Sequence, residues 1–209
     1  MLFEEALHII PQLKNKSLPG EHAHEKIMDS EVRKNIFINY GHTSPYRESA
    51  VIALLYPDEH RQARMLFILR KSYDGHHSGQ IAFPGGKKEP EDAGLLETAV
   101  RETYEETGVK PDEIQIIKSL SEVFIPVSNY LVQPFLAISN HKPDFVKDPV
   151  EVEAILELPF GEILKNPLVP LDKTYHDKAY RIYAFQVEKY QIWGATAMIL
   201  AEIRDLFGF

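Results

Sequence analysis

The segment that decides the fold runs from Arg101 to Val109 and reads RETYEETGV. It ends the clearest helix that the sequence predicts, from Glu91 to Gly108, which opens after a proline and closes at a glycine. At 3.6 residues per turn, Glu102, Glu105 and Glu106 fall within an arc of roughly 100° on one helix face. Like charges at this spacing repel one another. Three carboxylates kept together despite that repulsion indicate a hard-oxygen site suited to Mg²⁺ or Mn²⁺.

The surroundings of these acids favour a site over a plain acidic surface, which is what an isolated Glu-x-x-Glu-Glu usually forms. The turn Phe83-Pro84-Gly85-Gly86 precedes the helix, and its glycines let backbone groups approach a metal or phosphate closely. Arg101 is spaced to pair with Glu97 or Glu105 and so to hold the carboxylates in place. The adjoining arc, which we expect to pack on a sheet, is formed by Leu96, Ala99, Val100, Thr103 and Tyr104.

Composition excludes several other kinds of site and partner. The 209 residues include no cysteine, which rules out a disulfide framework, a Cys-ligated zinc site and a thiol nucleophile. The net charge of −8, without a dense Lys/Arg run, argues against a nucleic-acid partner. The first residues lack the basic start of a secretory signal, and apolar runs stay well below the roughly 18 residues that span a bilayer. We therefore expect a cytoplasmic protein with neither nucleic acid nor a membrane as partner.

The order of predicted elements indicates an α/β fold. Two strand-like runs, Ala50–Tyr56 and Met65–Leu69, flank a hairpin loop at Pro57–His60. Further strands are expected at Ile114–Leu120, Val132–Ile138 and Arg181–Val187, and helical segments at Leu2–Leu13, near Asp29–Asn35, at Phe160–Leu164 and from about Ala195 to Phe207. A Gly/Ser-rich linker does not divide the chain, so we expect one domain over residues 1–209, with an N-terminal helical extension over about residues 1–45.

The run from Gly86 to Val109 resembles the Nudix box, whose usual form is G-x5-E-x7-R-E-U-x-E-E-x-G-U, with U apolar. The central Arg-Glu-x-x-Glu-Glu-x-Gly is intact. Fourteen residues separate Gly86 from Arg101, one more than in the usual box, and Asp92 stands near the first acidic position. Thr103 takes the place of the apolar U. The resemblance implies an α/β/α sandwich with a mixed sheet, and hydrolysis of a nucleoside diphosphate linked to another moiety.

The resemblance also implies roles for single residues. In that family the glutamates that match Glu102 and Glu106 are the main metal ligands, Glu105 lies close by, and the backbone around Gly85 and Gly86 helps to complete the site. The implied cofactor is Mg²⁺ or Mn²⁺, which would lower the pKa of a bound water for attack on one phosphorus. The expected metal ligands are Glu102, Glu106, Glu105 and Gly86. The expected catalytic residues are Glu105, Arg101 and Glu151, with Glu105 and Glu151 as alternative general bases. The expected substrate contacts are Arg70, His77, Gly85 and Lys87.

The longer box and the segment before it, from Leu69 to Gly86, resemble the coenzyme A pyrophosphatase-like branch of the family, and the similarity extends from about residue 18 to the C-terminus. Branch members active on coenzyme A tend to carry Leu-Arg where this chain has Asp74-Gly75. The resemblance to this branch implies a small diphosphate substrate, either coenzyme A or an acyl-CoA. The alternative substrate is ADP-ribose, a dinucleotide or a nucleoside triphosphate. The alternative function of another class is a non-catalytic regulatory module that binds a nucleotide. A homodimer is a further possibility that the sequence leaves open.

Overall fold

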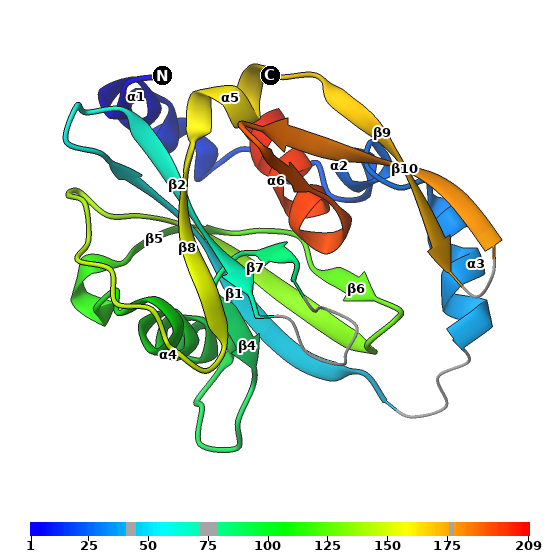
Figure 1. Cartoon of the computed structure of the whole chain (residues 1–209). Helices are drawn as coiled ribbons and strands as arrows, with labels where there is room; N and C mark the ends of the chain where they lie inside the picture. Colours follow the sequence, from blue (N-terminus) through cyan, green and yellow to red (C-terminus); the bar gives the residue numbers. More distant parts are fainter. Residues whose placement is uncertain (41–44, 72–78, 176–177) are drawn as a thin grey trace.

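A mixed β-sheet crosses the middle of the molecule (Figure 1). The structure is a computed structural model that describes residues 1–40, 45–71, 79–175 and 178–209. The sheet is formed by β1 (Arg47–Pro57), β2 (Ala63–Arg70), β3 (Ile81–Ala82), β4 (Gly85–Lys87), β5 (Gln115–Ser119), β6 (Val123–Ile125), β7 (Tyr130–Ile138) and β8 (Val152–Pro159). Strands β1 and β7 run parallel, whereas the other pairs are antiparallel.

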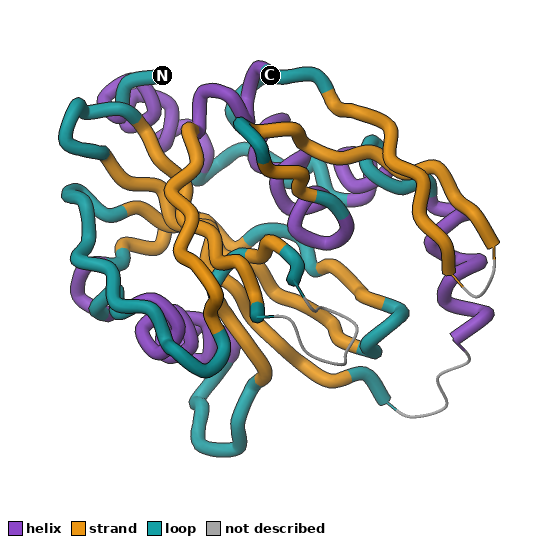
Figure 2. Tube along the Cα trace, viewed as in Figure 1, coloured by secondary structure: helices purple, strands orange, loops and turns teal. Residues whose placement is uncertain are grey.

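Helices cover both faces of this sheet, as Figures 1 and 2 show. Helix α4 (Leu95–Thr107) packs on one face, where Ala99 meets the inward side chains of Ile52 and Leu54. The alternate residues of the same strand, Ala53 and Leu55, face the larger buried cluster on the other side. That cluster also receives α1 (Phe3–Leu13), α5 (Phe160–Lys165) and α6 (Gly194–Leu206). The expected sandwich with a mixed sheet is therefore confirmed.

A second, smaller sheet lies beside α6 on the side away from α4 (Figure 1). It consists of β9 (Leu168–Tyr175), β10 (Lys178–Val187) and β11 (Tyr190–Ile192), all antiparallel. Two further helices, α2 (Glu21–Glu25) and α3 (Ser30–Tyr40), complete this side, and a short 3-10 helix, η1 (Pro111–Glu113), follows α4. Among the described residues, none of the helices is both long enough and apolar enough to cross a membrane.

The local predictions hold best where the pattern is regular. The hairpin of β1 and β2, the strands β5, β7 and β10, and the helices α1, α5 and α6 lie where they were expected. Helix α3 is longer than expected, and α2, β3, β4, β6, β8, β9 and β11 were not predicted. The extent of the domain, with residues 1–45 as an extension, stays a prediction.

Two predictions about the central helix were wrong. Helix α4 begins at Leu95 rather than Glu91, because the residues before it form a turn in which Asp92 accepts a hydrogen bond from the backbone of Glu89. Leu96 and Tyr104 were expected to pack on the sheet but are exposed. The buried stripe is rotated toward small and polar side chains, namely Thr98, Ala99, Thr103, Glu106 and Thr107. The helix therefore approaches the sheet closely and carries Glu106 inward.

Candidate active site

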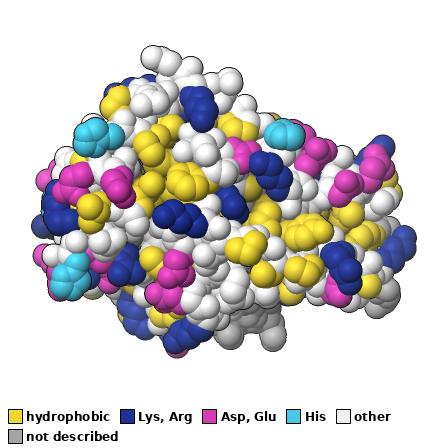
Figure 3. Space-filling view, turned by 90° about the horizontal axis from the view of Figure 1, so that it is seen from above, with side chains coloured by type: hydrophobic (Ala, Val, Ile, Leu, Met, Phe, Trp, Pro, Cys, Tyr) yellow, Lys and Arg dark blue, Asp and Glu magenta, His cyan; other side chains and the backbone are white. Residues whose placement is uncertain are grey.

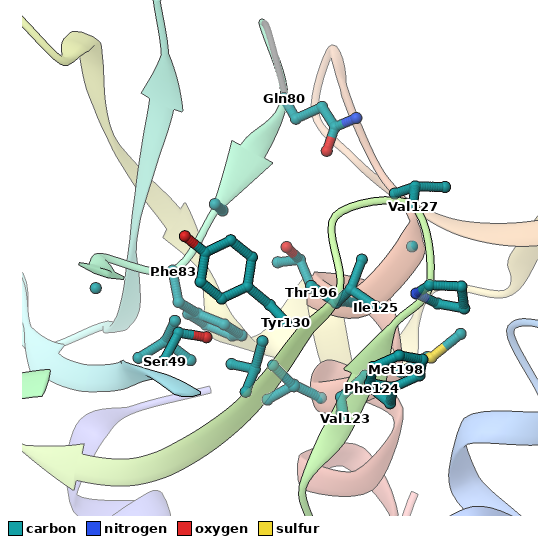
Figure 4. A pocket seen from close by; sticks show the side chains of 18 of the residues that line it. Ser49, Gln80, Phe83, Val123, Phe124, Ile125, Val127, Tyr130, Thr196 and Met198 are labelled. Carbon is teal, nitrogen blue, oxygen red and sulfur yellow. The ribbon is translucent and has the colours of Figure 1, made fainter. Parts of the chain in front are cut away.

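A cavity of about 610 Å³ opens between the two sheets. At one end it is lined by the β4 turn, with Gly85 and Gly86, and by Glu102 of α4. At the other end it is lined by residues of α3 and of the loop after β6. Figure 4 shows that the intervening walls are mainly apolar and aromatic, with Phe83 and Tyr130 near the centre. The cavity thus joins a charged end to a long apolar section, as ligand sites commonly do.

Glu106 is the most deeply buried acid of the charged end, with 3% of its surface exposed. Its Oε2 accepts a hydrogen bond from the backbone N–H of Gly85 at 2.8 Å. Its Oε1 lies 3.5 Å from Nη1 of Arg70 and has no hydrogen-bond partner among the described residues. Burial raises the pKa of Glu106 to about 8, although the Gly85 hydrogen bond and the Arg70 charge act in the opposite direction. The carboxylate therefore has an unsatisfied oxygen that a proton or a cation would stabilise.

Glu102 rests directly against the glycine turn. A Cβ added to Gly86 would lie 2.4 Å from the carboxyl carbon of Glu102, so a larger residue would displace the acid. Oε1 of Glu102 accepts a hydrogen bond from Nη1 of Arg101 at 3.0 Å. Burial raises the pKa of Glu102, and the charges of Glu105 and Glu151 add to this effect. Glycine is required here because the helix acid occupies the space of a side chain.

Arg101 holds the acids of α4 from the outer side. Its Nε and Nη2 donate to the two oxygens of Asp92 at 2.9 Å each, and its Nη1 donates to Oε2 of Glu105 at 3.0 Å as well as to Glu102. Asp92 also accepts a hydrogen bond from the Thr98 hydroxyl at 2.8 Å. The Arg101 hydrogen bonds hold the pKa of Asp92 well below its usual range. In this arrangement Arg101 is a positioning residue, and a direct catalytic role for it stays a prediction.

The two alternative general bases occupy different places. Glu105 has 55% of its side chain exposed and is paired with Arg101 at the edge of the helix. Glu151 precedes β8 and lines the cavity, and its charge raises the pKa values of both Glu102 and Glu106. The pairing of Arg101 with Glu105 agrees with the sequence, whereas Glu97 instead accepts a hydrogen bond from the backbone of Ala93.

A divalent cation fits this set of residues by its chemistry. Within the described part of the chain, three or more Asp, Glu or His side chains do not converge on one point. The fit depends instead on Oε1 of Glu106, which is buried without a hydrogen-bond donor, and on the carboxylate of Glu102 beside Gly86. Both supply the hard oxygen atoms that Mg²⁺ and Mn²⁺ prefer.

The remaining expected substrate contacts fall into two groups. Arg70, Gly85 and Lys87 line the cavity, whereas His77 lies outside the described residues. Tyr130, which the sequence did not single out, projects into the cavity, and the guanidinium carbon of Arg47 lies 4.2 Å from the centre of its ring (Figure 4). A lone tyrosine at the start of a strand carries no signal of this kind, because the cavity appears only when distant segments meet.

Comparison with known proteins identifies the family. The NUDIX domain matches residues 46–186. The chain belongs to the Nudix family. It is similar to the uncharacterized Nudix hydrolase NudL of Enterobacter sp. (strain 638), with 33% identity over 158 residues, which covers 75% of this chain and 81% of the relative. It is also 33% identical over 153 residues to NudL of Salmonella paratyphi B, covering 72% and 79% of the two chains.

Solved structures show the same fold. The Nudix hydrolase RenU from M. smegmatis aligns with a TM-score of 0.54 at 14% identity, covering 78% of this chain and 86% of that one. The MutT protein from Methanosarcina mazei Go1 aligns with a TM-score of 0.52 at 18% identity, covering 79% and 96%. The protein is thus a Nudix hydrolase, and members of this family typically use divalent metal ions. The α3 and α6 walls of the cavity lie outside the segment that matches the Nudix domain.

Proposed function

We propose that the protein hydrolyses the diphosphate linkage of coenzyme A or an acyl-CoA. The observation that carries this proposal is a pair of acids at one end of a cavity whose other walls are largely apolar: Glu102, which lines the cavity, and the buried Glu106, which accepts a hydrogen bond from the cavity residue Gly85. The acids suit a cation and a diphosphate, and the mainly apolar walls suit the nucleoside and the long, weakly polar arm that stand on the two sides of that diphosphate. ADP-ribose, a dinucleotide or a nucleoside triphosphate would use the same acids but less of the apolar wall.

In this proposal Glu102, Glu106 and the backbone of Gly86 hold Mg²⁺ or Mn²⁺. When bound, the ion lowers the pKa of a water and neutralises negative charge on the diphosphate. Arg101 keeps Glu102 in place through the 3.0 Å hydrogen bond. Catalysis of this kind depends mostly on positioning and electrostatics. The hydrogen bonds that Gly85 donates to Glu106 and Arg101 donates to Glu102 position the two carboxylates accordingly.

The other charged residues of the cavity act on the substrate and the water. Arg70 and Lys87 line the charged end and bind oxygens of the diphosphate. Glu151 faces the cavity and accepts the proton of the attacking water, whereas Glu105 supports Arg101. The apolar walls exclude bulk water and so strengthen each charged contact.

The proposed function also bears on where the protein acts and on its partners. A nucleotide substrate places the enzyme in the cytoplasm with a small molecule as its partner. The face seen from above carries Lys/Arg and Asp/Glu side chains interspersed around a hydrophobic band (Figure 3). Mixed charges of this kind do not favour a nucleic-acid backbone. A homodimer stays open.

A metal-dependent screen tests the activity. The full chain is incubated with Mg²⁺ or Mn²⁺ and with coenzyme A, acetyl-CoA, ADP-ribose, a dinucleotide and a nucleoside triphosphate, and products are separated by chromatography. We expect 3′,5′-ADP and phosphopantetheine from coenzyme A. Other products would shift the substrate to one of the alternatives. Binding without any product would favour the regulatory module and overturn the enzymatic proposal.

A double substitution tests the site. Glu102→Gln with Glu106→Gln is expected to lower turnover at least about 1,000-fold while the far-UV circular dichroism spectrum stays unchanged. Glu97→Gln on the same helix is the matched control, because Glu97 is exposed and accepts its hydrogen bond from the backbone of Ala93, away from the cavity acids. Near-normal turnover in a folded double mutant would refute the assignment of these acids.

A further inference from the structure

Arg33 is a charged residue of the cavity that the proposed chemistry leaves unused. It lies on α3 and lines the same cavity as Glu102. Helices α3 and α4 lie at opposite sides of the molecule (Figure 1), and Arg33 reaches the cavity from α3 whereas Glu102 reaches it from α4. The other charged side chains that line the cavity, among the residues described, belong to the acidic end: Arg70, Lys87, Glu102 and Glu151.

The hydrogen bonding of Arg33 is incomplete. Only 17% of its side chain is exposed, and its Nε is buried without a hydrogen-bond partner among the described residues. Burial lowers the pKa of Arg33. A buried donor without a partner destabilises the folded chain. Such a donor on a cavity wall indicates a ligand that supplies the acceptor.

The internal partner of Arg33 is suited to being displaced. Nη2 of Arg33 donates to Oε1 of Glu21 on α2. The Glu21 side chain is 60% exposed, so it is readily solvated once released. A guanidinium offers a planar fork of donors that matches a phosphate better than a single carboxylate oxygen. The apolar neighbours Met28 and Ile36, which line the same end, strengthen any charged contact made there.

We propose that Arg33 is a specificity residue that binds a second anionic group of the substrate, a phosphate monoester, while the diphosphate lies at Glu102 and Glu106. This inference rests on the proposed diphosphate hydrolysis and adds a requirement for the substrate. Residue 33 lies outside residues 46–186, which match the Nudix domain, so the preference belongs to the N-terminal segment of this chain. When the ligand is absent, the Glu21 carboxylate binds the Arg33 guanidinium, and it therefore competes with the ligand for Arg33.

Binding of two matched nucleotides tests the proposal without any need for turnover. Adenosine 3′,5′-bisphosphate and AMP differ by one phosphate monoester, and calorimetry with the full chain gives both dissociation constants. We expect the bisphosphate to bind at least about tenfold more tightly. Arg33→Gln should abolish this difference by weakening the binding of the bisphosphate. Equal binding of the two nucleotides by the wild type, or failure to bind either, overturns the proposal.

Three further variants separate recognition from a structural role. Lys34→Gln is the matched control, because Lys34 is the next residue on α3 and its side chain is 66% exposed, so the preference should remain. Glu21→Gln removes the competing carboxylate and should increase the preference. Arg33→Lys keeps the positive charge but lacks the planar set of guanidinium donors, so it should lose most of the preference for the bisphosphate. This variant provides the test if Arg33→Gln does not fold. A preference that survives in a folded Arg33 variant, or that Glu21→Gln leaves unchanged, contradicts the assignment.

Hydrolysis assays distinguish failure of this inference from failure of the proposed function. Coenzyme A and its analogue without the 3′-phosphate present the same diphosphate. Cleavage of both at equal kcat/KM would support the diphosphate hydrolase and overturn the role of Arg33. Discrimination in binding without cleavage of either would support Arg33 and overturn the proposed function.

Discussion

Arg101 donates hydrogen bonds to both carboxylate oxygens of Asp92, at 2.9 Å each, from the helix that also carries Glu102. Asp92 lies in the turn before α4, where the box is one residue longer than usual. Although the box contains one extra residue, Arg101 therefore still has an acidic partner before the helix. Since the third nitrogen of Arg101 binds Glu102 and Glu105, Asp92 indirectly fixes the position of Glu102.

Asp92→Asn should weaken both the fold and the activity. The substitution removes the charge that Arg101 is paired with and places an amide against a donor. We expect a loss of roughly 2–3 kcal/mol in the free energy of unfolding, less than for a fully buried pair, because Arg101 is partly exposed. The value of kcat should fall as well, because Glu102 loses its support. Urea unfolding and steady-state kinetics measure the two effects. Asp112→Asn, at an exposed acid, is the control and should change neither.

Gly86→Ala should impair catalysis more than stability. The added methyl group would meet the carboxyl group of Glu102, which is the far end of a flexible side chain and moves away. A displacement of about 1 Å at a catalytic group commonly costs about 100-fold in rate. Gly94→Ala is a matched control, because a Cβ there meets nothing within 4 Å. Equal activity of the two variants would show that the contact between Gly86 and Glu102 is unimportant.

The sequence predicted those parts of the site that depend on neighbouring residues. The glutamates of α4 follow from helical periodicity, and the close backbone approach at Gly86 follows from the glycine pair. The different roles of the acids could not be predicted from the sequence. Glu105 is turned to the edge by Arg101, and Glu151 enters from a loop some fifty positions away, so only the folded chain brings Glu151 beside Glu102.

The missed features share a physical cause, which is that they arise from tertiary packing. Tyr104 appeared apolar enough to face the sheet, but close packing favours the smaller Ala99 and Thr103. Strand β8 shows no clean alternation, because Ala154, Ile155 and Leu156 follow one another without a polar residue between them. The apolar wall of the cavity joins α3, β6 and α6. Contacts between segments so distant in the chain leave no local periodicity to read.

Without metal, the protein should lose stability as the pH rises. The pKa of Glu106 is about 8 in the folded chain, against an ordinary value of 4.5. The folded state therefore keeps a proton that the unfolded chain releases. This stabilisation, roughly a few kcal/mol, is fully present below pH 4.5 and is lost as the pH rises through about 8. Thermal melts of the wild type and Glu106→Gln from pH 5 to pH 9 in EDTA measure the difference.

Metal should reverse this trend in the wild type alone. Mg²⁺ or Mn²⁺ binds the ionised carboxylate, so the rise in Tm on adding metal should be larger at pH 8.5 than at pH 6. Glu106→Gln, which cannot ionise, should show little rise at either pH. The same metal-induced rise in both proteins would contradict the assignment of Glu106 as a ligand.

Glu151 and Glu105 should differ in their effect on turnover. Glu151 lines the cavity beside the acids of α4, whereas Glu105 is half exposed and paired with Arg101. A general base contributes about 100-fold or more, so Glu151→Gln should lower kcat by at least this factor without changing the affinity for Mn²⁺. Glu105→Gln should lower kcat only a few-fold, because its role is to support Arg101. Steady-state kinetics give kcat, and titration followed by electron paramagnetic resonance gives the Mn²⁺ affinity. A reversed order, with Glu105→Gln the more damaging change, would assign the base to the helix instead of the loop.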